Sequence, residues 1–229
     1  MDISVIVTNF NYGKLIRRCI RSLLNQNLSY KNFEIIIVDD ASTDESLDAI
    51  KSFSGYENIK IIKNKKNLGI GASSQIGLEN SRGKFFVRVD ADDFVQPPFL
   101  YMLYNFLKFN NKYVAVSCDY FLTNNEEKIL STKEFKNNYL ACGIMFRTSY
   151  LEVIGSYNKK KRIFEDKDLY KRINKSKIYH LPCPLYNYVQ HKNSLTKKII
   201  WKYLIKYLKK VNILTIKYSD LILNMNIVN

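Results

Sequence analysis

The chain has 229 residues, of which 46% are hydrophobic and 25% are charged. This length and composition suit one folded domain with a short C-terminal addition, and they exclude wholesale disorder. The net charge of +15 favours an acidic partner, such as phosphate groups, nucleic acid or an anionic membrane, unless it only reflects a lysine-rich composition.

The first half of the chain alternates between apolar strand patterns and helical patterns. Strands are predicted at residues 3–7, 33–38, 59–62, 85–89 and 113–118, and helices at 15–24, 71–80 and 97–109. Ser42 is predicted to cap one more helix, since Glu45 follows three residues later. The alternation predicts an α/β fold, in which helices flank both faces of a mostly parallel sheet.

The second half is less regular. Strands are predicted at residues 142–147, 178–181 and 185–190, and a polar helix at 166–174. From Lys197 onward apolar residues follow helical spacing, and Lys198, Lys202 and Lys209 fall on the opposite face. This pattern predicts either an interfacial membrane anchor or a helix packed on the domain.

The cysteines and the apolar runs indicate the compartment. Cys19, Cys118, Cys142 and Cys183 are widely separated and form no CxxC pair. We expect reduced, mostly buried thiols without a zinc site. No basic-then-apolar leader precedes the first strand pattern, and no run approaches 18 consecutive apolar residues. These features predict a cytoplasmic protein without a membrane span.

Polar residues follow three of the predicted strands at their carboxyl ends. Thr8 and Asn11 lie at the end of the first strand, Asp39 and Asp40 at the end of the second, and Asp-Ala-Asp-Asp at residues 90–93. Ligands of parallel sheets bind at this edge. Mg²⁺ and Mn²⁺ prefer carboxylate oxygens and bridge them to phosphates. A lone D-x-D is better explained by a solvated turn, so the surrounding motifs have to decide.

In order along the chain, these motifs resemble those of glycosyltransferase family 2, whose members have a GT-A fold. The similar segments are residues 4–11, residues 34–44, Asn67 with Gly69, residues 83–93, residues 155–158, the Glu-Asp segment at 165–169 with Arg172, and the His-x-x-Ser-x-Thr stretch at 191–196. The ordered matches cover about residues 3–196.

The resemblance implies a role for each matched residue. The nucleotide-sugar would be bound by Thr8, Asn11, Asp40, Asn67 and Asp90. Asp40 would accept a hydrogen bond from the base, foremost the uracil N3–H, and Asp90 would contact the ribose. Asp92 would hold Mn²⁺ or Mg²⁺ on the diphosphate, and His191 would complete that site. Asp166 would be the general base that deprotonates the acceptor hydroxyl, and a single displacement inverts the anomeric centre.

The implied function is that of an inverting glycosyltransferase. It would move a sugar from a nucleotide diphosphate sugar, foremost a UDP-sugar, to a glycan or lipid-linked acceptor in capsule or lipopolysaccharide assembly. The catalytic domain would comprise residues 1–196, with a nucleotide-sugar-binding half (1–118) and an acceptor half (119–196). Residues 197–229 lie outside the resemblance and would form a basic amphipathic tail, which either binds the inner face of the plasma membrane or packs on the domain. No nucleic acid is expected as a partner.

Ser74 departs from the family, because members often carry an Arg at this place. Either Arg82, Lys84 or Arg88 compensates, or the donor is unusual. Two other functions remain to be weighed. A metal-dependent nucleotidyltransferase would share the carboxylates, but residues 8–14 contain only one Gly for a phosphate loop. A non-catalytic basic binding protein is disfavoured, because every expected carboxylate is present and no nucleic-acid module is recognisable.

Overall fold

The computed structural model describes residues 1–135, 142–192 and 194. It consists of two compact units, Met1–Val189 and Gln190–Asn229. The elements of the first unit are β1 (Ile3–Asn9), α1 (Gly13–Leu24), β2 (Phe33–Asp39), α2 (Ser46–Lys51), β3 (Ile59–Lys63), α3 (Ile70–Glu79), β4 (Phe85–Asp90), β5 (Phe94–Val95), α4 (Phe99–Phe109), β6 (Ala115–Thr123), β7 (Ile129–Lys133), β8 (Met145–Arg147), α5 (Thr148–Val153), α6 (Glu165–Arg172), a 3₁₀ turn (Lys175–Lys177) and β9 (Ile178–Val189).

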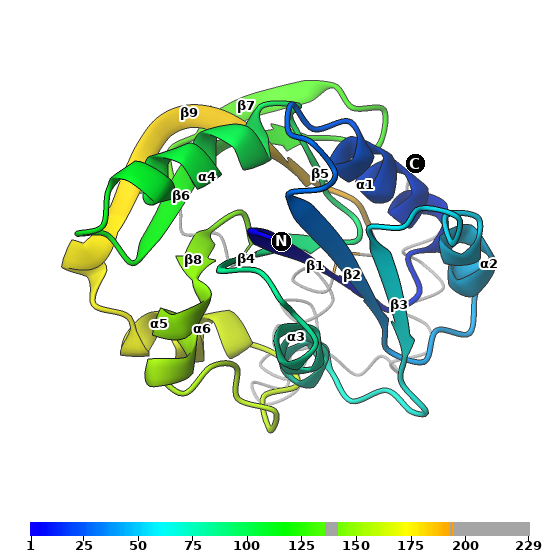
Figure 1. Ribbon diagram of the computed structural model, residues 1–229. Coiled ribbons are helices and arrows are strands. Elements are labelled where there is room, and N and C mark those ends of the chain that lie inside the picture. The colour runs from blue at the N-terminus through cyan, green and yellow to red at the C-terminus, as the bar shows by residue number, and fades with distance from the viewer. Residues whose placement is uncertain (136–141, 193, 195–229) are drawn as a thin grey trace, which may run out of the picture. The chain divides into compact units, whose positions relative to one another are not determined.

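One sheet organises this unit, in the order β3-β2-β1-β4-β8-β6-β9-β5, with β7 beside β6 (Figure 1). Strands β1 to β4 pair in parallel. Strand β8 is antiparallel to both β4 and β6, whereas β6 and β9 are parallel. The predicted α/β class is therefore confirmed. The parallel pairs of β1 to β4 are formed by the first half of the chain, and the antiparallel pairs all involve strands of the second half.

Helices cover both faces of the sheet, because its central strands alternate between two apolar cores. Val5, Ile37 and Val87 contribute to a core shared with α1, α2 and α4. Ile6 and Ile36 point to the opposite core, shared with α3, α5 and α6, which lie together below the strands in Figure 1. Burial on both faces explains why β1 and β2 are continuous runs of apolar residues rather than alternating ones.

Two local predictions are wrong. Ser42 does not cap a helix: α2 begins at Ser46, whose backbone N–H donates to Asp44 Oδ1 at 3.0 Å. The Ser42 hydroxyl instead accepts from Asn11 N at 3.0 Å, which ties the loop after β1 to the loop after β2. The two strands predicted at 178–181 and 185–190 form the single strand β9, because pairing with β6 continues through two register shifts.

The remaining predictions differ in outcome. Cys19, Cys118 and Cys142 are buried and unoxidised, and Cys183 is half-buried, as expected. No helix in the described part of the chain is long and apolar enough to cross a membrane. The predicted tail (197–229) lies outside the described residues, and the division into domains at 118 and 196 stays a prediction.

Candidate active site

The carboxyl ends of β1, β2 and β4 meet at one edge of the sheet, called the carboxyl edge below. In the parallel register Thr8 of β1 is opposite Val38 of β2 on one side and opposite Asp90 of β4 on the other. Asn9 Nδ2 donates to Asp39 Oδ1 at 2.8 Å, which holds the first two strand ends together. The edge thus brings the predicted residues Thr8 and Asp90 side by side.

Asn11 shapes the loop that follows β1. Its backbone lies in the left-handed region, with φ of 59°, which Asn adopts more readily than most residues. Its side-chain oxygen accepts from Thr43 N at 2.8 Å. Asn11 therefore joins two loops of the carboxyl edge, and the predicted nucleotide contact would have to use its remaining bonding capacity.

Asp40 is buried and fixes the segment that leads into α3. Its Oδ1 accepts from Asn64 Nδ2 and from Leu68 N, each at 2.8 Å. Its Oδ2 accepts from Gly69 N at 2.8 Å. Three of about four acceptor positions are thus engaged by the protein, and one remains for the predicted bond from the base.

Asn67 is held by Arg162, a residue that precedes α6 in the chain. The guanidinium donates to both the side-chain oxygen and the backbone carbonyl of Asn67. Arg162 comes so near that a Cβ on Gly69 would lie 2.8 Å from its Cα. The predicted site residue Asn67 therefore belongs to a loop clamped between Asp40 and the segment before α6.

The acidic residues of the turn after β4 lie in different surroundings. Asp93 is buried and accepts from the Tyr186 hydroxyl at 2.7 Å and from Val189 N at 2.8 Å. Its backbone N–H closes the turn on the Asp90 carbonyl at 3.0 Å. Burial raises the pKa of Asp93, and the charges of Asp92 and Asp90 raise it further. Asp93 is a structural residue of the turn.

Asp90 and Asp92 are half-buried. Burial raises the pKa of Asp90 to about 6, although the neighbouring Arg88 acts in the opposite direction. The Asp92 carboxylate is hydrogen-bonded to the Tyr12 side chain, and burial together with this contact raises the pKa of Tyr12. Tyr12 was not recognised from the sequence, where its only sign is a place next to Asn11.

The surroundings of each carboxylate indicate whether it could bind a divalent metal ion. Asp90, Asp93 and Cys142 have ligand atoms within 4.8 Å of one another. The oxygens of Asp93 already accept protein hydrogen bonds, however, and a thiol is a soft ligand that Mg²⁺ and Mn²⁺ do not favour. Asp90 Oδ1 is buried and lies 3.0 Å from Arg88 Nε without an aligned hydrogen bond. Asp90 with Asp92 therefore fits a hard divalent ion better than the group that includes the thiol.

Asp166 lies in the first turn of α6, directly after Glu165. Glu165 is buried and forms an ion pair with Arg88 at 2.7 Å. Arg88 Nε in turn lies 3.0 Å from Asp90 Oδ1, close but without an aligned hydrogen bond. Two short contacts therefore connect the predicted base segment to the carboxyl edge.

Comparison with known proteins identifies the family. The family model described as Glycosyl transferase family 2 matches residues 4–204, most of the chain. The chain belongs to glycosyltransferase family 2. Among solved structures, a Staphylococcus aureus TarS fragment in complex with UDP-GlcNAc has a TM-score of 0.72 at 22% identity, over 85% of this chain and 60% of that one. This likeness confirms the predicted GT-A fold.

The curated relatives are longer proteins. An uncharacterized glycosyltransferase of Haemophilus influenzae is 40% identical over 115 residues, which are 50% of this chain and 35% of that protein. A poly(ribitol-phosphate) beta-glucosyltransferase of Bacillus spizizenii is 36% identical over 51% of this chain and 19% of its own. A cholesterol galactosyltransferase of Borreliella burgdorferi is 33% identical over 69% of this chain and 44% of its own. The chain thus spans less than half of each of these relatives.

Ser74, where family members often carry an Arg, is contacted by an arginine from another element. Ser74 is buried in α3, and Arg88 Nη1 donates to its Oγ at 3.4 Å. Arg82 instead forms an ion pair with Glu34 at 2.9 Å, and Lys84 is exposed next to the start of β4. Of the three proposed replacements, Arg88 is the one whose guanidinium contacts Ser74.

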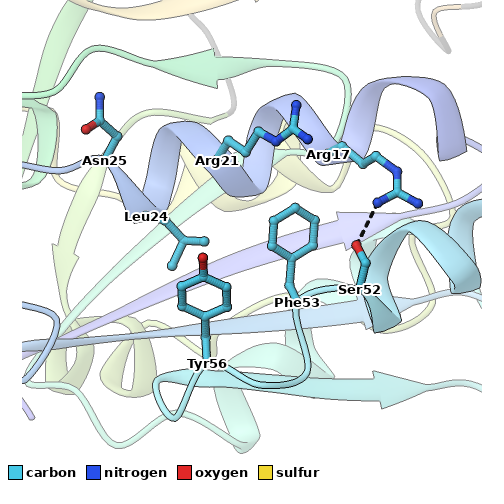
Figure 2. Close-up of a pocket in the computed structure, with 7 residues that line it drawn as sticks. All are labelled: Arg17, Arg21, Leu24, Asn25, Ser52, Phe53 and Tyr56. Carbon is cyan, nitrogen blue, oxygen red and sulfur yellow. Dashed lines mark hydrogen bonds between the residues drawn. The ribbon is translucent and has the colours of Figure 1, made fainter.

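Two further features are His191 and a hollow beside α1. His191 is buried and belongs to the second unit, so its predicted share in the metal site stays a prediction. A hollow of about 530 Å³ between α1 and the end of α2 is lined by Arg17, Arg21, Leu24, Asn25, Ser52, Phe53 and Tyr56 (Figure 2). It contains none of the predicted site residues.

Proposed function

We propose that this member of the family is an inverting glycosyltransferase that takes a sugar from a UDP-sugar with the help of Mn²⁺ or Mg²⁺. The observation that carries the proposal is the convergence at the carboxyl edge. Thr8 and Asp90 share one register position, Asp92 follows at the same turn, and α6 with Asp166 is tied to Asp90 through Arg88 and Glu165. The similarity in fold to a TarS fragment in complex with UDP-GlcNAc supports the choice of UDP.

The residues of the carboxyl edge have separate roles in this reaction. Thr8, Asn11, Asp40, Asn67 and Asp90 bind and orient the donor. Asp90 and Asp92, with His191 as a third ligand, would hold the divalent ion, which when bound neutralises charge on the departing diphosphate. Asp166 takes the proton from the acceptor hydroxyl, and its role requires a carboxylate that is ionised and reachable.

The acceptor is proposed to be a hydroxyl of a cell-surface glycan precursor or a lipid-linked glycan. The names of two relatives include poly(ribitol-phosphate) and cholesterol, so chains similar in sequence act on chemically different acceptors. The net charge of +15 suits an acceptor that bears phosphate, because a basic surface raises the local concentration of anions.

The test is a screen of UDP-sugars for hydrolysis and binding in the presence of Mn²⁺. We expect UDP to bind about tenfold more tightly with Mn²⁺ than without it, and Asp92→Asn to remove this gain. Asp48→Asn changes an exposed acid in the first turn of α2 and is the matched control, expected to behave as the wild type. Unchanged metal-dependent turnover in Asp92→Asn would show that Asp92 is not a metal ligand.

A further inference from the structure

Arg88 is a buried cation on a strand whose other face is entirely apolar. Along β4, Phe85, Val87 and Val89 belong to the core under α1 and α4. Side chains alternate across a strand, so Arg88 and Asp90 point to the face covered by α3 and α6. The Arg88 side chain is only 2% exposed, and its guanidinium has to find its partners inside the protein, because an unpaired buried charge is strongly destabilising.

The partners of Arg88 come from three different elements. Nη1 lies 2.7 Å from Glu165 Oε1 at the start of α6. The same nitrogen donates to Ser74 Oγ of α3 at 3.4 Å. Nε lies 3.0 Å from Asp90 Oδ1 at the end of β4. One guanidinium therefore connects the carboxylate proposed to contact the donor with the residue directly before the proposed base.

The two ends of α6 are anchored by different arginines. At its C-terminal end Arg172 donates to the carbonyls of Ile154 and Ser156. At its N-terminal end Glu165 is fixed by Arg88, and the preceding Phe164 has the left-handed φ of 59°. The contact between Arg88 and Glu165 is thus a polar link between the first turn of α6, which includes Asp166, and the carboxyl edge, in addition to the contact of Arg162 with Asn67.

We propose that Arg88 is a positioning residue of the transfer reaction, which through Glu165 sets where Asp166 stands relative to Asp90 and Asp92. The inference rests on the proposed function, since it assigns Asp166 as base and Asp90 as donor contact. Arg88 does not touch the substrate in this account. Its effect is on the alignment of the base with the acceptor oxygen, where small displacements reduce the rate strongly.

Three variants test this coupling: Glu165→Gln, Arg88→Met and the double variant. Glu165→Gln weakens the link to α6 but leaves Arg88 beside Asp90. We expect it to lower kcat for the UDP-sugar selected by the screen by about tenfold or more, with KM for the UDP-sugar within about threefold of wild type. Arg88→Met lowers kcat as well. The double variant is no worse than the poorer single variant, because both changes break the same link.

Arg82→Met is the matched control. It also removes an arginine from an ion pair with a buried glutamate, Glu34, in the same sheet, but not at the carboxyl edge. We expect its kcat to stay within about twofold of wild type. Should Arg88→Met fail to fold, the double variant still reports, because it removes both charges of the buried pair and leaves neither unpaired.

Hydrogen exchange provides a readout that does not need turnover. We expect the amides of α6 to exchange about tenfold faster in the double variant, while those of β1 and β4 keep their protection. A folded double variant with wild-type kcat overturns the positioning role. If the wild type transfers no sugar, the proposed function is wrong, and hydrogen exchange still tests the Arg88–Glu165 contact. Unchanged exchange of the α6 amides in the double variant would then show that this contact does not hold α6.

Discussion

Three acidic residues open α6, and their surroundings separate their tasks. Glu165 is buried against Arg88, and Asp168 forms an ion pair with Arg172 at 2.9 Å. Asp166 is half-buried, and within the described residues no hydrogen bond or ion pair engages its carboxylate. A general base needs an acceptor position that the protein has not already used. Among these three acids, Asp166 meets that requirement.

Replacing Asp166 therefore tests the proposed base at the scale of one atom. We expect Asp166→Asn to lower kcat by roughly 10²- to 10⁴-fold, because the amide cannot take the acceptor proton. UDP binding with Mn²⁺, measured by calorimetry, stays near the wild-type value, since the donor is bound elsewhere. Asp168→Asn, a change of the same kind further along the same acidic turn, keeps most of the activity. Similar losses in both variants would speak against Asp166 as the base.

At this scale the partners of the acids left no signal in the sequence. The roles of Asp90, Asp92 and Asp166 stay predictions from ordered motifs, and the cation that pairs with Asp90 and Glu165 could not be assigned from the sequence. Arg88 reaches Ser74 and Glu165, which lie 14 and 77 residues away along the chain. Contacts across such separations leave no periodic signal. The pairing of Tyr12 with Asp92 escaped prediction for the same reason.

At the scale of elements, the start of α3 depends on backbone conformation. Gly69 has φ of 91° and ψ of 163°, a combination that is essentially restricted to glycine. This conformation directs the Gly69 N–H to Asp40 Oδ2 and allows Arg162 to approach closely. The loop that carries Asn67 is thereby held in one arrangement beside the carboxyl edge.

Gly69→Ala is expected to destabilise the fold by about 1–3 kcal/mol, because the added Cβ meets both the strained backbone region and Arg162. Urea unfolding followed by circular dichroism measures the loss. Gly55→Ala is the control, since nothing lies within 4 Å of a Cβ at that position. Its stability should stay within about 0.5 kcal/mol of wild type or rise slightly. Equal stability of the two variants would show that Gly69 is not constrained as described.

Predictability of the elements follows their length and burial. Strands β1, β2 and β4 and helices α1, α3 and α4 were predicted, because long apolar patterns mark them. Strand β5 has two residues, β7 is mostly exposed and α5 has six residues, so none offers enough periodicity. Ser42 carried a capping pattern, but tertiary bonds from Asn9 and Asn11 engage its hydroxyl instead. At Ser42 the contacts between the two loops therefore outweigh the local capping pattern.

At the scale of the whole molecule, the charge is not explained by the carboxyl edge alone. At this edge Arg88 already pairs with two acids, Asp90 and Glu165. The chain has 36 basic and 21 acidic residues, and the residues of the carboxyl edge do not account for this excess of basic residues. The sequence places part of it after residue 196, where Lys198, Lys202 and Lys209 are predicted to lie on the helix face opposite the apolar residues.

This charge distribution predicts binding to anionic membranes, which would bring the enzyme to a lipid-linked acceptor. Each lysine near an anionic surface contributes about 1 kcal/mol. Replacing Lys198, Lys202 and Lys209 together by Gln in the full chain should therefore reduce co-sedimentation with phosphatidylserine vesicles by about tenfold or more. The control replaces the exposed Lys31, Lys51 and Lys128 by Gln, which changes the net charge equally. If both triple variants pellet to the same extent, attraction is a property of the overall charge, and the tail is not the anchor.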